Sequence, residues 1–303
     1  MMKITEFQQK ITALFPKMDV RPNESMANHT SFRIGGPAEV MILPKNVEEL
    51  AEILKKTKEI GTNPPILGAG TNVLAPDDGI PGLVVCLKDS LNGIELLDDT
   101  RIRVAAGVTM ARAAVFAAGK NLSGLEFAHG IPGTVGGGVY MNAGAYGGEI
   151  KDVCESVDVM DMNGVVTTLS GEEMRFAYRH SRLEDEGGIV VSAVFRLTPK
   201  PEAEIRALMQ DLMNRRKTSQ PLDLPSAGSA FKRPVGGYAA ALIDQAGLKG
   251  YQVGGAAISQ KHAGFAVNLG GATAADVKAL LKQVSDIVFE QSGIRLEPEV
   301  RIW

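Results

Sequence analysis

Apolar positions recur with two different periods along this chain, and the period predicts the type of each element. Residues 46–61 carry apolar side chains at helical spacing, with Asn46 placed to cap the helix and Glu49 three residues later. Short apolar runs at 38–43 and 64–67 flank this helix. The segment therefore predicts a β-α-β unit.

The same patterns continue through the rest of the chain. They predict further helices at 1–15, 109–121, 201–217, 237–247 and 273–293. They predict further strands at 82–87, 100–107, 187–197, 262–269 and 294–303. Thr109 is the expected cap of the second of these helices.

The middle of the chain has shorter elements. Apolar alternation around Asn163-Gly164 predicts a β-hairpin within 151–170. Residues 171–183 predict a short helix followed by a turn, and the prolines and glycines of 219–234 predict a loop. The elements favour an α+β protein of two or three domains, with a boundary near residues 200–220.

Composition changes this picture little. The chain has 303 residues, 45% hydrophobic and 22% charged, and its net charge of −3 gives no reason to expect nucleic acid or an anionic membrane as a partner. Cys86 and Cys154 fit no disulfide or zinc pattern, and no signal peptide is recognisable. No apolar stretch approaches the ~18 residues of a membrane span. We expect a cytoplasmic protein without a metal site.

Two glycine-rich loops are the main candidates for ligand binding. Eight glycines lie between Gly130 and Gly148, and "LGAGTNVL" at 67–74 forms a second loop upstream. Glycine is costly to order, so a dense run indicates tight turns or a backbone close to a ligand. The G-x-G-x-x-G fingerprint of dinucleotide folds and the G-x-x-x-x-G-K-[ST] phosphate loop are both absent. The scattered histidines give no zinc-hydrolase pattern either.

Both loops carry side chains suited to phosphate. Thr71 and Asn72 lie in the first loop, and Thr134 and Asn142 in the second. Exposed backbone N–H groups in such turns can form anion-binding nests. The alternative is that both loops are tight turns without a ligand. It is less favoured for two loops than for one, since ordering each glycine-rich loop costs backbone entropy that no ligand contact would offset.

Seven motifs follow one another along the chain. They are "HTSFRIGGPAE", "LGAGTNVL", "GLEFAHGIPGTVGGGVYMNAGAYGGEI", "AYRHSRL", "PSAGSAFKRP", "KHAGFAVN" and "LEPEVRIW". In this order they resemble the UDP-N-acetylenolpyruvoylglucosamine reductases, flavoenzymes of peptidoglycan precursor synthesis, from about residue 28 to residue 302. The interval between "AYRHSRL" and "PSAGSAF" leaves no room for the inserted tyrosine loop of the longer subgroup, so the chain is similar to the shorter one.

The resemblance implies an α+β architecture. A vanillyl-alcohol-oxidase-type FAD-binding fold of two subdomains would be followed by a C-terminal α/β substrate domain. FAD-binding subdomain 1 would span 1–86 and be joined by the C-terminal strand 297–303, FAD-binding subdomain 2 would span 87–205, and the substrate domain 206–296.

The resemblance also implies non-covalently bound FAD, held between the two glycine loops. The residues that would contact FAD are Arg33, Gly68, Ala69, Gly70, Thr71, Asn72, Leu74, His129, Gly130, Pro132, Gly133, Thr134, Gly136, Gly137, Asn142 and Ala143. His129 stands where the family more often has a small residue or cysteine. A covalent link to the flavin and a loop hydrogen bond are both open for it, and the hydrogen bond is favoured.

The implied reaction reduces an enol ether double bond next to a carboxylate. Hydride addition leaves negative charge there, which a desolvated pocket tolerates only beside cations or proton donors. By resemblance, Arg179 would pair with the carboxylate, Glu299 would act as a protonated acid opposite, and Ser229 would protonate carbon. From the residues alone, a solvated arginine, a surface glutamate and a turn serine are the ordinary alternatives.

The implied ligands are UDP-N-acetylglucosamine-enolpyruvate and NADPH, the hydride donor. The residues that would bind the sugar nucleotide are Tyr178, Lys217, Lys232, Arg233 and His262. A monomer without a nucleic-acid or membrane partner is expected. Two other hypotheses stay open: an FAD-dependent oxidase or dehydrogenase on the same fold, and a non-catalytic protein that binds flavin or a nucleotide sugar.

Overall fold

The structure is a computed structural model that describes residues 5–303, in two compact units. The first unit contains the chain up to Pro22, Val40–Ala69 and Gly82–Arg215; the second contains Asn23–Glu39, Gly70–Pro81 and Arg216–Trp303. The chain thus crosses between the units five times. The first four residues of the predicted N-terminal helix, and of the proposed segment 1–86, lie outside the described residues. No helix within 5–303 is both long and apolar enough to span a bilayer.

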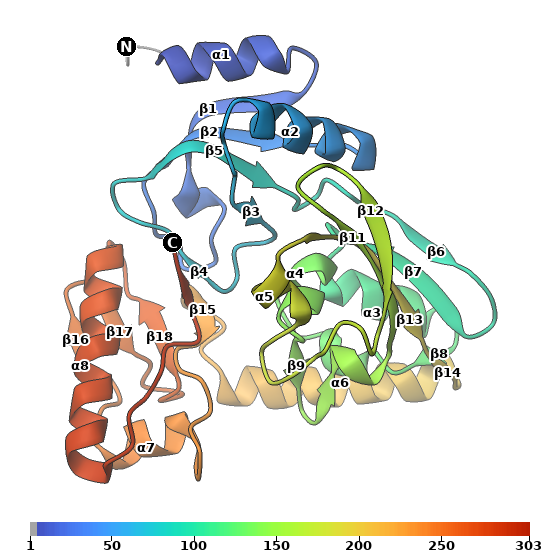
Figure 1. Cartoon of the computed structure of the whole chain (residues 1–303). Helices are drawn as coiled ribbons and strands as arrows, with labels where there is room; N and C mark the ends of the chain where they lie inside the picture. The colour runs from blue at the N-terminus through green and yellow to red at the C-terminus, as the bar shows by residue number, and fades with distance from the viewer. Residues whose placement is uncertain (1–4) are drawn as a thin grey trace. The chain divides into compact units, whose positions relative to one another are not determined.

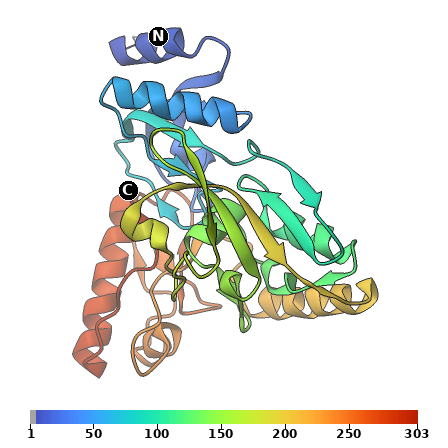
Figure 2. The same cartoon turned by 45° about the vertical axis from the view of Figure 1, so that its right-hand side comes forward.

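The first unit holds most of a four-stranded sheet of order β1-β2-β5-β3. Its strands are β1 (Asp19–Ser25), β2 (Pro37–Leu43), β5 (Ile80–Cys86) and β3 (Ile66–Leu67). Helix α2 (Val47–Glu59) lies across this sheet in both views (Figures 1 and 2). The Asn46 side chain accepts a hydrogen bond from the Glu49 N–H at 2.8 Å, which confirms the predicted helix cap. Helix α1 (Glu6–Leu14) precedes the first strand.

A five-stranded antiparallel sheet of order β12-β11-β13-β7-β6 completes the first unit. Its strands are β12 (Val166–Ser170), β11 (Cys154–Met160), β13 (Ile189–Arg196), β7 (Arg101–Ala105) and β6 (Ile94–Leu96). The predicted hairpin at Asn163-Gly164 is confirmed by the β11–β12 pairing. One hydrophobic core runs from Val40 and Ile53 to Ile102 and Phe195, so both sheets of this unit share it.

The remaining helices and short strands of this unit carry the loops of interest. They are α3 (Met110–Ala118), α4 (Val135–Tyr140), α5 (Arg182–Glu186), α6 (Glu202–Ser219), whose last turn enters the second unit, β8 (Leu122–Ser123), β9 (Gly144–Ala145), β10 (Gly148–Glu149) and β14 (Thr198–Pro199). Thr109 caps α3 by accepting from the Arg112 N–H at 3.2 Å, as predicted.

The second unit is built on a sheet of order β15-β18-β17-β16. Its strands are β15 (Ser226–Ser229), β18 (Phe265–Asn268), β17 (Ala256–Ile258) and β16 (Gln252–Val253), and its helices are α7 (Ala239–Gln245) and α8 (Ala274–Ser292). Helix α8 runs beside the strands (Figure 1). Strand β4 (Val73–Leu74) pairs in parallel with β19 (Arg301–Ile302). Phe32, Ile34 and Leu74, from early in the chain, share the core of this unit.

Three predicted elements are wrong in detail. The loop predicted for 219–234 contains strand β15, whose alternation is interrupted by a bulge at Gly228. In 171–183 the order is reversed, since a tight turn at Ala177–His180 comes first and α5 starts at Arg182. The predicted strand 294–303 shrinks to β19, because most of this segment pairs only at isolated positions.

Candidate active site

The predicted site residues fall into both units. Those in the first unit are Gly68, Ala69, His129, Gly130, Pro132, Gly133, Thr134, Gly136, Gly137, Asn142, Ala143, Tyr178 and Arg179. Those in the second unit are Arg33, Gly70, Thr71, Asn72, Leu74, Lys217, Ser229, Lys232, Arg233, His262 and Glu299. Each unit therefore carries part of the predicted cofactor site and part of the predicted catalytic set.

The two glycine loops meet within the first unit. A Cβ atom at Gly68 would lie 2.6 Å from the Thr134 Oγ1 atom, so only glycine allows this approach. The same threonine caps α4, because its Oγ1 accepts from the Gly137 N–H at 3.4 Å. The start of the first loop thus lies against the second loop.

Several glycines of the second loop serve the protein rather than a ligand. A Cβ atom at Gly136 would meet Ala106 at 2.9 Å, one at Gly138 would meet the sulfur of Met110 at 2.7 Å, and one at Gly148 would meet Phe127 at 2.7 Å. At Gly137 the nearest atom is 3.6 Å away, an ordinary contact. Gly137 is therefore a better candidate than Gly136 for close approach to a ligand.

The backbone around these loops fits a phosphate-bearing cofactor. The N–H groups of Gly68, Ala69, Gly130 and Gly133 have no hydrogen-bond partner within residues 5–303. Unpaired N–H groups at glycine turns are suitable donors to an anion. His129 adds a buried Nδ1 atom without a partner among the described residues. Burial, and then the nearby Arg206 cation, lower the pKa of His129, so its imidazole is neutral near pH 7.

Arg179 occupies a strained position in the turn between Ala177 and His180. Two backbone hydrogen bonds close this turn, of 3.0 and 3.2 Å. The φ angle of Arg179 is 54°, in the left-handed region that few non-glycine residues adopt. Its guanidinium donates to the Gly144 carbonyl at 3.3 Å and lies 5.0 Å from the Tyr178 ring centre. The half-buried cation is thus supported from two directions.

The side chain of Asn142, a predicted FAD contact, bonds within the protein. It is fully buried, and both N–H groups of its side chain are used, one by Glu149 and one by the Ala177 carbonyl, each at 2.9 Å. No donor remains for a phosphate. Leu74, another predicted FAD contact, is also fully buried, in β4. Contacts of these two side chains with a cofactor are not supported by their burial.

Glu149 is ionised beside Asn142. Burial acts to raise the pKa of its carboxyl group, but hydrogen bonds from Lys151 and Asn142 outweigh burial and lower that pKa. The Lys151 ammonium lies 2.9 Å from the Glu149 Oε2 atom.

Ser229 is turned outward by a β-bulge. In the β15–β18 pairing, Ser226 faces Val267 and Ser229 faces Phe265, so one residue is inserted between them. Gly228, with φ of 77°, supplies the left-handed conformation that this requires. Ala227 is buried while Ser229 is exposed, although a regular strand would place both on one face. The bulge therefore exposes the hydroxyl group.

The backbone of Glu299 is hydrogen-bonded to Ala230, the residue that follows Ser229. Its N–H donates to the Ala230 carbonyl at 2.9 Å, and Phe231 bridges to Pro298. The Asn72 side chain donates to the Glu299 carbonyl at 3.3 Å. The second unit therefore brings together one predicted FAD contact and two predicted catalytic residues.

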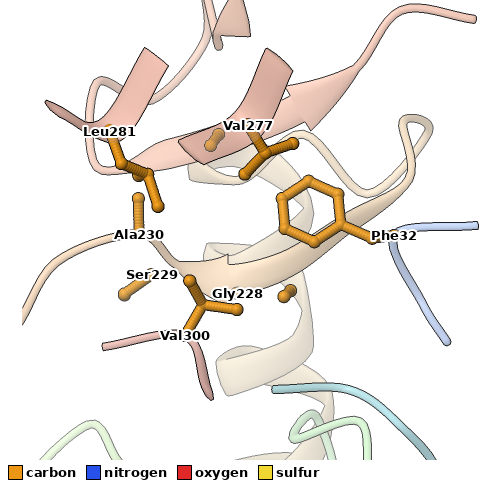
Figure 3. Close-up of a pocket in the computed structure, with 9 residues that line it drawn as sticks. Phe32, Gly228, Ser229, Ala230, Val277, Leu281 and Val300 are labelled. Carbon is orange, nitrogen blue, oxygen red and sulfur yellow. The ribbon is translucent and has the colours of Figure 1, made fainter. Parts of the chain in front are cut away.

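The space behind Ser229 is apolar. The pocket there is lined by Phe32, Ala227, Gly228, Ser229, Ala230, Ala266, Val277, Leu281 and Val300. Figure 3 shows Phe32, Val277, Leu281 and Val300 gathered around β15. Most of the lining residues are buried members of the core of this unit, so the region packs beneath the strand.

The predicted substrate-binding residues of the second unit make contacts within the protein. Lys232 pairs with Glu297 at 3.4 Å, and the Arg233 guanidinium lies 4.0 Å from the Tyr238 ring centre. The Lys217 carbonyl, in the last turn of α6, accepts from the Lys261 ammonium at 2.6 Å. His262 accepts from the Gly264 N–H at 3.1 Å, and burial lowers its pKa. Arg33 lies in a turn with φ of 55°.

Comparison with known proteins identifies the family. The chain is 45% identical over 307 aligned residues to a UDP-N-acetylenolpyruvoylglucosamine reductase of Agathobacter rectalis, covering 98% of both chains. The chain belongs to the UDP-N-acetylenolpyruvoylglucosamine reductase family. A reductase of Caldanaerobacter subterraneus subsp. tengcongensis is 47% identical over 92% of both chains. The family resemblance of the seven motifs is confirmed.

Domain models and a solved structure agree with this reductase family. Residues 220–303 match its C-terminal domain, and residues 38–170 match an FAD binding domain. The crystal structure of a reductase from Thermus caldophilus has a TM-score of 0.79 and 36% identity, covering 95% of this chain and 99% of that one. These matches confirm the α+β, vanillyl-alcohol-oxidase-type fold and the shorter subgroup.

Sequence reasoning missed the residues that hold the Arg179 turn. Glu149 accepts from the side chain of Asn142, seven positions earlier, and Ser181 donates to the carbonyl of Tyr140, 41 positions earlier. Neither contact produces a periodic pattern, so only the position of Ser181 inside "AYRHSRL" could have indicated it. Among residues 5–303, no group of three or more histidines, cysteines and carboxylates is placed to hold a metal.

Proposed function

We propose that this reductase uses FAD and NADPH to convert UDP-N-acetylglucosamine-enolpyruvate into UDP-N-acetylmuramate for peptidoglycan precursor synthesis. The observation that carries the proposal is the hydrogen bond from the Glu299 N–H to the Ala230 carbonyl, because it holds the backbone of Glu299 against the strand that ends at the exposed Ser229. The sequence identity of 45% and 47% to two UDP-N-acetylenolpyruvoylglucosamine reductases supports the proposal. The proposal includes a cytoplasmic monomer and the domain boundaries given above.

The loops around Gly68 and Thr134 would hold the pyrophosphate of FAD. Their unpaired N–H groups supply donors, and the absence of a side chain at Gly137 leaves room for close approach. FAD, when bound, would supply the hydride that it takes from NADPH. Arg33, Gly70, Thr71 and Asn72 remain the proposed FAD contacts of the second unit.

Three residues would handle the charge and the proton. The Arg179 guanidinium would bind the substrate carboxylate and stabilise the charge that develops beside it. Glu299, in its protonated form, would donate to the same group. Ser229 would protonate the carbon next to the carboxylate, which a weak acid can do only for a strongly basic carbon in fixed geometry.

The cations of the second unit would bind the UDP diphosphate. The candidates are Lys217, Lys232, Arg233 and His262, and Tyr178 in the first unit would pack beside the substrate or the flavin. Lys232 and Arg233 would exchange their present partners, Glu297 and Tyr238, for phosphate oxygens.

Replacing Ser229 by alanine tests this assignment. We expect flavin reduction by NADPH to stay within about twofold of the parent, while flavin reoxidation by the enolpyruvyl substrate slows roughly 10²–10⁴-fold, the usual contribution of a positioned proton donor. Stopped-flow absorbance of the flavin measures each half-reaction.

Ser226→Ala, on the same strand, is the matched control and should behave like the parent. Equal loss in both half-reactions would show that Ser229 is structural. Purified protein that takes up no added FAD would contradict the flavoenzyme proposal itself. NADPH consumption by oxygen alone, never by the substrate, would favour an oxidase of the same fold.

A further inference from the structure

The side chain of Asn142 connects three backbone segments of the first unit. It donates to the Ala177 carbonyl and to the Glu149 carboxylate, and its Oδ1 atom accepts from the Lys151 N–H at 3.0 Å. These partners fix the orientation of the amide, because a carbonyl and an ionised carboxylate only accept and a backbone N–H only donates. Asn142 is fully buried, so its amide group is shielded from water.

Arg179 depends on this connection for its position. Ala177 opens the turn that carries Arg179, and Gly144, which accepts from its guanidinium, follows Asn142 by two residues. Asn142 therefore bonds to Ala177, where the turn begins. It also lies two residues before Gly144, which the Arg179 guanidinium contacts. Because the left-handed conformation of Arg179 is unfavourable by itself, surrounding contacts must maintain it.

Ser181 provides a second anchor on the far side of the same turn. Its hydroxyl donates to the Tyr140 carbonyl at 2.7 Å, and the residue is fully buried. Tyr140 is the last residue of α4, two positions before Asn142. The turn is thus attached to one short stretch of chain at both of its ends.

We propose that Asn142 is a positioning residue for Arg179, holding the turn so that the guanidinium stays beside Gly144 and faces the substrate carboxylate. This inference rests on the role proposed above for Arg179. Asn142 itself touches neither substrate nor flavin through its side chain; its effect passes through Ala177.

A double-mutant cycle tests the inference. Asn142→Gly removes the amide while keeping the left-handed backbone, whose φ is 41°. We expect flavin reoxidation by the enolpyruvyl substrate to slow up to about 10²-fold, as for a catalytic group displaced by about 1 Å, with flavin reduction by NADPH nearly unchanged. In an Arg179→Ala background, the same substitution should add less than about twofold, since its effect passes through the missing side chain.

Asn121→Gly is the matched control. Asn121 also has a left-handed φ, of 58°, and its side chain also accepts from a backbone N–H, that of Glu202, but elsewhere in the unit. This variant should react like the parent.

Three results would overturn the inference. The first is that Asn142→Gly slows flavin reoxidation by as large a factor in the Arg179→Ala background as in the parent. The second is that Asn142→Gly slows both half-reactions equally. The third is that Asn142→Gly leaves flavin reoxidation unchanged although Arg179→Ala abolishes substrate reduction. An Arg179→Ala variant that reduces substrate normally would instead remove the proposed role of Arg179. If Asn142→Gly fails to fold, Ser181→Ala undergoes the same cycle, and the same outcomes decide.

Discussion

At the residue scale, the pKa of the loop residue His129 is lowered although the imidazole has no ion-pair partner within residues 5–303. Its Nδ1 atom is buried without a hydrogen bond among the described residues, and burial followed by the Arg206 cation lowers its pKa. Both effects disfavour the charged form of the imidazole. The residue is therefore suited to hydrogen bonding as a neutral ring beside the loop proposed to bind phosphate, where a neutral acceptor or donor can complement the N–H groups.

This state of His129 predicts a pH dependence of stability. The unfolded chain binds a proton at His129 near its ordinary pKa of 6.5, whereas the folded chain binds it only at lower pH. Stability should therefore fall as pH decreases below about 6.5, because the unfolded state then holds more protons. Calorimetric unfolding between pH 7.5 and 5.5 measures the slope.

His129→Gln should reduce the dependence of the free energy of unfolding on pH. Part of the dependence that remains should come from His262, because burial also lowers its pKa. His262→Gln is thus expected to reduce the slope further when combined with it. A slope identical in the parent and in His129→Gln would refute the assignment.

At the element scale, local signals decided which elements the sequence could predict. Helix α2 was predictable because its cap lies within three residues of its partner. Strand β15 was not, because the bulge at Gly228 breaks the alternation that identifies a strand. The Asn142 network gave no signal either, since Ala177 lies 35 positions away. Arg179, Ser229 and Glu299 were found by family resemblance and not by pattern.

Helix α8 depends on a residue far away in sequence. Its first turn has a local capping box from Thr273 and Asp276. In addition, the Asp77 carboxylate accepts from the N–H groups of Ala274 and Ala275 at 2.6 and 3.0 Å. A carboxylate at this end pairs the exposed N–H groups and complements the helix dipole.

Asp77→Ala should therefore lower the free energy of unfolding by about 1 kcal/mol, within the usual range of 0.5–2 for loss of a helix cap. Urea denaturation of the purified protein measures the change. Asp78→Ala, at the exposed neighbouring position, should change it by less than about 0.5 kcal/mol. Equal effects of the two substitutions would show that the Asp77 contact is not the cause.

At the scale of the whole molecule, the second unit is discontinuous in sequence. Residues 220–303 match the C-terminal domain of the family, yet the unit also contains Asn23–Glu39 and Gly70–Pro81. The first of these segments contributes Phe32 and Ile34 to its core, and the second contributes Leu74. The Asn268 side chain also donates to the Phe32 carbonyl at 3.0 Å. The matched segment alone therefore lacks part of its own core.

A fragment spanning 216–303 should not unfold cooperatively. We expect its circular dichroism to change gradually on heating, since the missing core residues expose apolar surface of α8 and β18. Supplying 23–39 and 70–81 on the same polypeptide through glycine-serine linkers should restore a transition. A sharp transition of the short fragment would contradict this expectation.

The discontinuity also affects synthesis on the ribosome. Phe32 leaves the exit tunnel early, but Asn268, which binds its carbonyl, follows 236 residues later. At roughly 5–20 residues per second, the delay is about 10–50 s. For that time Phe32 and Ile34 lack the core partners that come from residues 216–303, although Leu74 is already synthesised. Binding of this early segment by a ribosome-associated chaperone would shield these two apolar side chains until the C-terminal part of the core is synthesised.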